Sequence, residues 1–408
     1  MNGLFRAIDL RYVEGMSQAS GSHDFITFNF DTGSIQASQW LMLGEAMSKC
    51  QHLAGAPLKP RAASELAAIY LARGVQATTA IEGNTLSEDE VKAIVEKGTA
   101  NVPESRAYLE REVQNIAGCL SEIDHALGDG TRLNINVERL CYLNFKILDG
   151  IPDKPEVIPG QIRQHNVAVG TYRAPDHEDV RVLLENLVKW LSELRSEVSK
   201  NSRREERFVN AVLAAILAHL YIAWIHPFGN GNGRLARLIE VQILSESGVI
   251  PIVATNLLSD HYNKTRSAYY LALDSAQRNV ASFVAYALRG FVDELRDQID
   301  RVRSENLLIH WESYVYEVFR RKPSTAARDR QRDVALNMRS EIIYTPEEIT
   351  ELTTGLARKY ATCGERTPAR DMNDLAKMEL VEKVGYRGYR VLREKIEAFI
   401  PPVAAELD

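Results

Sequence analysis

The chain has 408 residues, enough for two or three domains, and 45% of them are hydrophobic and 25% charged, as in ordinary globular proteins. Its formal net charge of −6 argues against a nucleic-acid or membrane surface along the whole chain, although a local basic patch is compatible with it. The 4 cysteines are widely spaced and form no CxxC pair, so we expect reduced thiols in a cytoplasmic protein.

Most of the chain is predicted to be helical, because apolar residues recur at spacings of three and four. Residues 1–60 have a mixed pattern, in which QASGSHDFITFNFDTGS (18–34) predicts a loop with a short strand. Helices are predicted over residues 61–82, 87–97, 104–127, 135–149, 179–197, 204–225, 233–247, 259–277 and 279–320. The expected fold class is therefore mainly α.

The helical pattern stops between Pro159 and Pro175. There the segment PGQIRQHNVAVGTYRAP places apolar residues on both sides of Gly170, which predicts a short β-hairpin. Without further context, an ordinary surface hairpin is the simpler interpretation.

The segment Phe208–Phe228 is apolar and about long enough to cross a membrane. However, it contains Asn210 and His219 and ends in a polar, glycine-rich loop. A helix that is apolar all round is more typical of the buried centre of a helical bundle, so no membrane is expected.

The loop that follows, HPFGNGNGRLAR (226–237), combines several features of an anion site. Pro227 disfavours helical geometry at His226, and residues 231–233 can present successive backbone N–H groups at the start of the next helix. Arg234 and Arg237 project from one face of that helix, where a positive charge is unfavourable unless a polyanion lies nearby. A triphosphate fits this arrangement, and His226 could then accept a proton from an incoming hydroxyl.

The simpler alternative for this loop is a glycine-rich turn between helices, with a core histidine and two solvated arginines. The coincidence of several anion-binding features disfavours it. The sequence GxxxxGK[ST] is absent, so the loop is not that of a P-loop NTPase.

HPFGNGNGRLAR resembles the signature of the Fic family, in which a histidine, a phenylalanine and an acid precede GNGR, and a second arginine follows three positions on. The resemblance covers about residues 105–300. It implies a helical core with a β-hairpin flap and an enzyme that transfers AMP from ATP to a Ser, Thr or Tyr hydroxyl of a target protein, or of itself. It also implies Mg²⁺ as a cofactor, and it makes a homodimer plausible without locating an interface.

The resemblance also implies a role for individual residues by position. The general base would be His226, and Phe228 would anchor the loop. The flap, entered through GQIR with Arg163, would bind target backbone. For both Tyr269 and Tyr270, core packing is an alternative. The phosphate-binding residues would be Gly231, Asn232, Gly233, Arg234 and Arg237, the flap residues Val167, Ala168 and Val169, and the adenine-pocket residues Tyr269, Tyr270 and Gln277.

A second motif lies upstream, in TTAIEGNTLS (78–87). Thr78, Glu82 and Gly83 have the spacing of the family's inhibitory motif, (S/T)xxxE(G/N), on a helix expected at about 65–84. A carboxylate inserted near Arg237 would form a charge-assisted pair and take the place of an outer phosphate. The alternative is an ordinary helix C-terminus followed by glycine.

One position departs from the family pattern. The acid that helps to hold Mg²⁺ falls on Asn230, which offers only a neutral oxygen and so is a weak metal ligand. Either the phosphates hold most of the metal and transfer persists, or the activity has shifted to removal of AMP, to another phosphate-containing donor, or to binding alone.

The C-terminal part has a different pattern. RRKPSTAARDRQRD, from Arg320, predicts a basic, exposed connector. Helices predicted at 349–361 and 364–378, followed by apolar runs around the turn GYRG (385–388), have the order of a winged helix-turn-helix. In the second helix Thr367 is expected to cap and Leu375 and Met378 to face a core. The residues that could contact DNA are Thr367, Arg370, Asn373 and Arg387.

A nucleotide-sensing transcriptional regulator that binds DNA is therefore the competing function, unless this tail only packs on the core or binds protein. The acids among its basic residues weaken its charge for DNA. The expected domains are an N-terminal region at 1–104, the Fic core at 105–300, a helical and basic linker at 301–340 and the winged-helix domain at 341–408.

Overall fold

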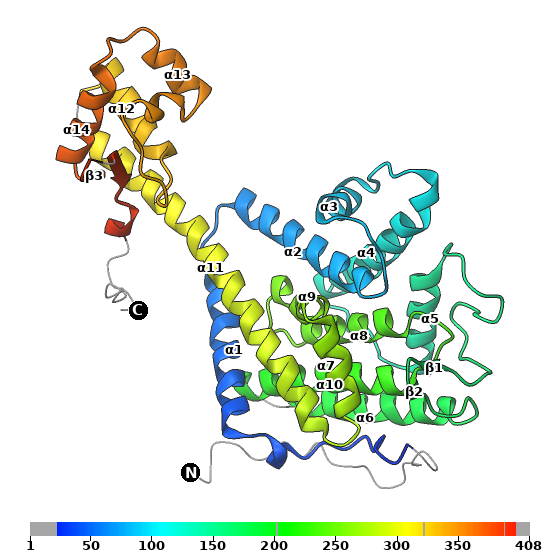
Figure 1. Cartoon of the computed structure of the whole chain (residues 1–408). Helices are drawn as coiled ribbons and strands as arrows, with labels where there is room; N and C mark the ends of the chain where they lie inside the picture. The colour runs from blue at the N-terminus through cyan, green and yellow to red at the C-terminus, as the bar shows by residue number, and fades with distance from the viewer. Residues whose placement is uncertain (1–22, 201–202, 321–322, 387, 397–408) are drawn as a thin grey trace. The chain divides into compact units, whose positions relative to one another are not determined.

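The structure is a computed structural model that describes residues 23–200, 203–320, 323–386 and 388–396 (Figure 1). It divides into two compact units, residues 1–299 and 300–408, and the boundary between them falls within helix α11 (Val280–Arg320). We call these the first and the second unit and describe each separately.

The first unit is built almost entirely of helices, which confirms the predicted mainly α class. Apart from the stretch 259–277, the helices that were predicted for this unit from residue 61 onward are present to within a few residues at each end. In chain order the first unit contains α1 (Ala37–Gly55), α2 (Pro60–Ala80), α3 (Glu88–Lys97), α4 (Ala107–Gly128), α5 (Val137–Leu148), α6 (Val180–Lys200), α7 (Arg204–Ile225), α8 (Asn232–Glu246), α9 (Leu257–Lys264), α10 (Arg266–Ser275) and the start of α11. Short 3₁₀ helices lie at Thr32–Ser34, Glu104–Arg106 and Ile252–Ala254.

The prediction for the first 60 residues was wrong in two respects. Helix α1 was not predicted, although its buried residues Leu43, Ala46 and Cys50 have helical spacing. In the described part of the segment predicted to hold a strand, residues 23–34, Ile26, Phe28 and Phe30 are buried in alternation, but beyond an isolated β-bridge at Phe30 they form no strand element. The period of two was real, but here it lets an irregular segment, in which Phe28 has φ 47°, pack its apolar side chains into a helical core.

The single helix predicted at 259–277 is in fact two helices, α9 and α10. They meet at Thr265, whose backbone leaves helical geometry at φ −114° and ψ 36°. The Thr265 hydroxyl donates to the carbonyl of His261 at 2.8 Å. A threonine hydroxyl that bonds back to the preceding turn in this way favours a bend in the helix.

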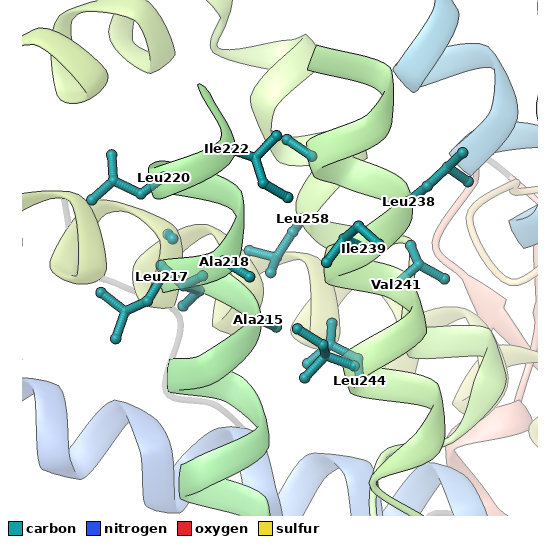
Figure 2. Packing of buried hydrophobic residues seen from close by; sticks show 14 of the residues in the cluster. Ala215, Leu217, Ala218, Leu220, Ile222, Leu238, Ile239, Val241, Leu244 and Leu258 are labelled. Carbon is teal, nitrogen blue, oxygen red and sulfur yellow. The ribbon is translucent and has the colours of Figure 1, made fainter. Parts of the chain in front are cut away.

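The centre of the first unit is the pair α7 and α8, which pack side by side (Figure 2). Ala215 and Ala218 on α7 face α8, and their small side chains leave room for Ile239 and Leu244 between the helices (Figure 2). Helix α7 is long and apolar enough to cross a membrane, but 94% of its most apolar window is buried inside the protein, as the sequence favours. Burying this pair positions the loop between them, residues 226–231.

The predicted β-hairpin is present. Strand β1 (Ala168–Val169) pairs antiparallel with β2 (Tyr172–Arg173), so that Ala168 faces Arg173 and Val169 faces Tyr172. Gly170 has φ 59°, a left-handed conformation that glycine adopts without strain. The Tyr172 hydroxyl donates to the carbonyl of Trp224 at 2.8 Å and ties the hairpin to the end of α7.

The second unit has its own apolar core, which includes Trp311, Leu356, Leu375 and Val391. Strand β3 (Val381–Val384) pairs antiparallel with β4 (Gly388–Val391). The order of two helices followed by a hairpin is the one the sequence predicts. After α11 the elements are α12 (Ala326–Asn337), a 3₁₀ helix at Glu348–Glu351, α13 (Thr354–Tyr360), α14 (Thr367–Lys377), β3 (Val381–Val384), β4 (Gly388–Val391) and a 3₁₀ helix at Arg393–Ile396.

Two expectations for the second unit were wrong. The segment expected to be an exposed connector contains α12, and its Arg330 and Gln331 are buried because they donate to the fully buried carboxylate of Asp371, at 2.6 and 2.9 Å. Thr367 does not cap α14; it is the first helical residue, and Arg366 occupies the cap position. Arg387 lies outside the described residues.

Candidate active site

The candidate active site begins where α7 ends. His226 adopts a left-handed conformation, φ 49° and ψ 60°, and its backbone N–H donates to the carbonyl of Ile222. Pro227 prevents the helix from continuing. On the ring, Nδ1 lies 3.3 Å from the carbonyl oxygen of Ala223. Because a carbonyl only accepts hydrogen bonds, the ring proton belongs on Nδ1, and Nε2 keeps a free lone pair.

The environment of His226 keeps its ring neutral. Burial lowers the pKa of His226 to about 4, although the contact with Ala223 and the charge of Glu82 act in the opposite direction. A neutral imidazole with a free Nε2 is the form that can accept a proton.

The loop after His226 is held rigidly from inside. Phe228 is buried, and its backbone N–H donates to Oδ1 of Asn232 at 2.9 Å. The Nδ2 of Asn232 donates in turn to the carbonyl of Phe228 at 2.8 Å. The Asn232 side chain therefore closes the loop, and only its backbone N–H is left to face a ligand.

The turn into α8 has the geometry of an anion site. Gly231 is the N-cap of α8 with φ 80°, and a Cβ built on it would lie 2.9 Å from Nδ2 of Asn144. That same Nδ2 donates to the carbonyl of Asn230 at 2.9 Å. The N–H groups of the next residues, Asn232 and Gly233, belong to the first helical turn, where no intrahelical acceptor exists. Such groups bind anions, helped by the helix dipole.

Arg237 lies beside this turn and is bonded through Nε and one terminal nitrogen to the N-terminal part of the chain, while its other terminal nitrogen is buried without a hydrogen-bond partner. Its Nε donates to the Thr78 hydroxyl at 2.5 Å, and one terminal nitrogen donates to the Thr78 carbonyl at 2.9 Å and to Glu82 Oε1 at 2.6 Å. Only 1% of Arg237 is exposed. Arg237 is 159 positions from Thr78 and 155 positions from Glu82 along the chain. The loop motif and the upstream motif thus meet in space.

Glu82 covers the anion turn itself. It lies in the turn just after α2, which ends at Ala80, and Gly83 follows with φ 101°. A Cβ built on Gly233 would come within 2.4 Å of Glu82 Oε1, so the carboxylate touches the first turn of α8. Burial alone would raise the pKa of Glu82, but Arg237 and Arg234 outweigh it and the pKa is lowered. The side chain is therefore an anion at neutral pH, lying against the first turn of α8.

Arg234 is held by partners that the sequence did not point to. It donates to Glu112 of α4 at 2.6 Å and to Oδ1 of Asn230 at 3.1 Å. Glu112 also accepts from Asn84 at 2.8 Å, just after the turn that holds Glu82. Glu112 belongs to no recognisable sequence motif. Its contact with Arg234 is apparent only from the packing of α4 against α8.

Two further residues brace the loop. Arg163 is buried, and it donates through Nε to the carbonyl of His226 at 2.8 Å and through a terminal nitrogen to that of Pro175 at 2.5 Å. Asn144 is fully buried between the loop and Gly160, whose N–H it accepts at 2.9 Å. The sequence indicated Arg163 through GQIR, whereas nothing in the sequence singled out Asn144.

The expected adenine-pocket residues separate into two groups. Tyr269 is buried, stacks on Tyr262 and bonds through its hydroxyl with Nε2 of His219 at 2.9 Å, so core packing describes its place. Tyr270 is 47% exposed. Gln277 lies just beyond the end of α10 and donates to the side chain of Asp274. Of the three, Tyr270 and Gln277 remain accessible to a base.

The expected flap residues lie at the surface. Ala168 and Val169 are exposed and Val167 is partly buried. Among the described residues, β2 is the only strand that pairs with β1. The other edge of β1 can therefore accept an extended peptide.

The described residues contain no group of three or more His, Cys, Asp or Glu side chains that could hold a metal ion. Asn230 has its oxygen already occupied: Oδ1 accepts from its neighbour's N–H, that of Gly231, at 2.6 Å as well as from Arg234. Its Nδ2 donates to Oδ2 of Asp153 at 2.5 Å. Asp153, from the loop between α5 and β1, is a second acid that the sequence did not indicate.

Comparisons with known proteins agree with this geometry. Residues 134–244 match the Fic/DOC family. Protein adenylyltransferase fic-1 of Caenorhabditis elegans is 28% identical over 234 residues, 57% of this chain and 42% of that protein. The fic-1 of Caenorhabditis briggsae is 29% identical over 213 residues, 52% of this chain and 38% of that protein. The chain thus spans less than half the length of these relatives.

Solved structures share the fold. A Fic family protein from Desulfovibrio desulfuricans G20 superposes with a TM-score of 0.51 at 21% identity, over 88% of this chain and 97% of that one. Fic-1 (residues 134–508) from C. elegans superposes with a TM-score of 0.51 at 23% identity, over 66% of this chain and 74% of that one.

Proposed function

Because residues 134–244 match the Fic/DOC family, we propose that this chain is a protein adenylyltransferase. It would transfer AMP from ATP to a Ser, Thr or Tyr hydroxyl of a target protein. The observation that carries the proposal is the neutral His226, with a free Nε2, beside the N-terminus of α8 and Arg234 and Arg237. The curated relatives are named protein adenylyltransferases, which agrees with it.

The chemistry follows from this arrangement. The target hydroxyl gives its proton to Nε2 of His226 while its oxygen bonds to the α-phosphorus of ATP. The bond from that phosphorus to the oxygen bridging it to the β-phosphate breaks, and pyrophosphate leaves. The N–H groups of Asn232 and Gly233 bind the inner phosphates, and Arg234 and Arg237 bind the outer ones. Tyr270 and Gln277 border the base.

The target would be held by its main chain. An extended target segment adds to the free edge of β1 at Val167–Val169 and brings its hydroxyl toward His226. Backbone pairing depends little on the side chains of the target. The flap would therefore position the target hydroxyl but select only weakly for the amino-acid sequence around it.

The same geometry supports autoinhibition by Glu82. With Glu82 bonded to Arg237, an outer phosphate loses its arginine and meets a carboxylate of like charge. ATP that enters despite this cannot seat its outer phosphates on Arg237, and its α-phosphate is misaligned for attack. Thr78 strengthens the block, because it holds the same guanidinium through its hydroxyl and its carbonyl.

A divalent cation, when bound with the triphosphate, offsets phosphate charge and stabilises the leaving pyrophosphate. Asn230 by itself fits this ion poorly, since its oxygen is neutral and already accepts from Gly231 and Arg234. If the chain does not transfer AMP from ATP, the alternative activities for this site are removal of AMP from a modified protein or transfer from another phosphate-containing donor.

The test is intact-mass analysis of the Glu82→Gly variant after incubation with ATP and Mg²⁺, together with labelling of lysate proteins by radioactive ATP. We expect AMP on the chain or on lysate proteins, and none with the Glu82→Gly/His226→Ala double variant. Absence of any AMP adduct from Glu82→Gly would contradict the proposal.

The second unit supports a second, separate proposal, binding of DNA. Arg370 and Asn373 are exposed on α14, ahead of the β3–β4 hairpin, where a winged helix-turn-helix would present them. Arg370→Ala in the full chain should weaken a salt-dependent shift of random duplex DNA, whereas Arg358→Ala on α13 should not. No shift of DNA by the parent chain would reject this function.

A further inference from the structure

The carboxylate missing at position 230 is present nearby in space. Asp153, in the loop between α5 and β1, places Oδ2 at 2.5 Å from Nδ2 of Asn230, while its Oδ1 accepts from the N–H of Lys154 at 2.8 Å. Each oxygen of Asp153 therefore keeps a lone pair. Asp153 is exposed, so an ion from solution can reach it.

The position of Asp153 is set by contacts on both sides of it. Asn230 cannot turn freely, because its Oδ1 accepts from both Gly231 and Arg234 and so directs Nδ2 at the aspartate. Farther along the same loop, Val157 packs on Gly229, where an added Cβ would meet it at 3.0 Å, and Gly160 is bonded to Asn144. The loop is thereby docked on the residues that precede the anion turn.

A carboxylate at this place opposes the binding of a polyanion. Like charges at close range disfavour each other, and no arginine or lysine forms an ion pair with Asp153 in the described part of the chain. The arrangement becomes favourable when a divalent cation lies between the carboxylate and the phosphates. Magnesium is commonly held in this way, by one or two carboxylates together with phosphate oxygens.

We propose that Asp153 is the carboxylate ligand of the divalent cation that accompanies the nucleotide, and that Asn230 is a positioning residue that holds Asp153 through its Nδ2. This inference rests on the proposed function, since it takes a nucleoside triphosphate as the ligand of the anion turn. It accounts for an asparagine in the family's acidic position: the charge has moved to a neighbouring loop, and the amide orients it.

The test measures metal binding without transfer. In the Glu82→Gly background with α,β-methylene-ATP, which cannot give up AMP, Mn²⁺ affinity is measured by electron paramagnetic resonance. We expect Asp153→Asn to weaken Mn²⁺ binding about tenfold or more, and to leave nucleotide affinity in EDTA the same or tighter. Glu156→Gln removes an equal charge from the same exposed loop and should leave Mn²⁺ affinity unchanged.

A second variant separates a ligand from a general charge effect. Asn230→Asp combined with Asp153→Asn returns a carboxylate to position 230 and should restore most of the Mn²⁺ affinity. Parent-like Mn²⁺ affinity of Asp153→Asn, or equal losses in Asp153→Asn and Glu156→Gln, would overturn the inference. Neither result bears on AMP transfer, which is judged by the Glu82→Gly adduct alone, so the two proposals fail separately.

Discussion

At the scale of single residues, the site depends on two ionisable groups whose protonation is set by their surroundings. His226 is kept neutral by burial, and Glu82 is kept charged by Arg237 and Arg234. One can accept a proton, and the other lies against the first turn of α8. Both states are those that the proposed autoinhibited adenylyltransferase requires.

The pH dependence of labelling follows from His226. Its pKa is lowered to about 4, so the proton-accepting form persists well below the usual value of 6.5. In the Glu82→Gly variant, which also removes a charge that raises this pKa, we expect a labelling rate that is level from about pH 8 to pH 6 and falls only as the pH approaches the lowered pKa. A pH–rate profile checks this. A midpoint near 6.5 would mean that the base is not buried as described.

The proposed inhibitory role of the ion pair between Glu82 and Arg237 predicts the effect of Glu82→Gln, which keeps the shape of the side chain and removes its charge. A hydrogen bond to a charged group contributes about 1.5–3 kcal/mol, so labelling should rise by roughly ten- to a hundredfold. The matched control is Glu96→Gln, an exposed acid at the end of α3. Initial rates of AMP incorporation measure both, and equal rates in Glu82→Gln and the parent would refute an inhibitory role for the charge.

At the scale of elements, the docking of α2 brings Thr78 and Glu82 to Arg237. Helix α2 packs on α9 at Gly74, where an added Cβ would lie 2.5 Å from Cβ of Asn256. Glycine here permits an approach that any other residue would prevent. We therefore expect the contact between Glu82 and Arg237 to depend on Gly74, which lies eight residues before Glu82, about two helical turns away.

Gly74→Ala should accordingly act as an activating substitution. The added methyl group forces α2 away from α9, loosens the pair between Glu82 and Arg237 and raises labelling severalfold, with faster hydrogen exchange in α2. The control is Gly118→Ala in α4, which meets nothing within 4 Å and should leave labelling unchanged. Unchanged exchange and labelling in Gly74→Ala would show that α2 docks without this close contact.

At the scale of the whole molecule, the chain has two separate apolar cores, and each unit carries its own buried polar network. In the second unit, Asp371 is fully buried and accepts from Arg330, Gln331 and Tyr360. This network joins α12, α13 and α14, and a buried carboxylate is tolerated only while its donors remain.

Arg330→Ala should therefore destabilise the second unit by about 3–5 kcal/mol, because it leaves the Asp371 carboxylate buried without its charge partner. Arg358→Ala, an exposed position on α13, is the control and should change stability by less than about 0.5 kcal/mol. Hydrogen exchange in α12 and α14 reports the loss. Parent-like protection in Arg330→Ala would mean that the network contributes little.

The sequence by itself determined most of the helices and the hairpin, and it predicted the chemistry proposed for HPFGNGNGRLAR. These depend on local periodicity, on turn residues and on a dense motif, all of which act over a few neighbouring positions. It also indicated Thr78 and Glu82, because their spacing is itself a motif.

Only the tertiary structure decided which distant residues complete the site. Glu112, Asn144 and Asp153 carry no local pattern, and they matter because helix and loop packing brings them within hydrogen-bond distance of Arg234 and Asn230. The same holds for Arg330. The charged residues around it predicted an exposed side chain, but it is buried because it donates to the carboxylate of Asp371. Pairing across the fold depends on contacts between segments far apart in the chain, and such contacts leave no trace in the spacing of neighbouring residues.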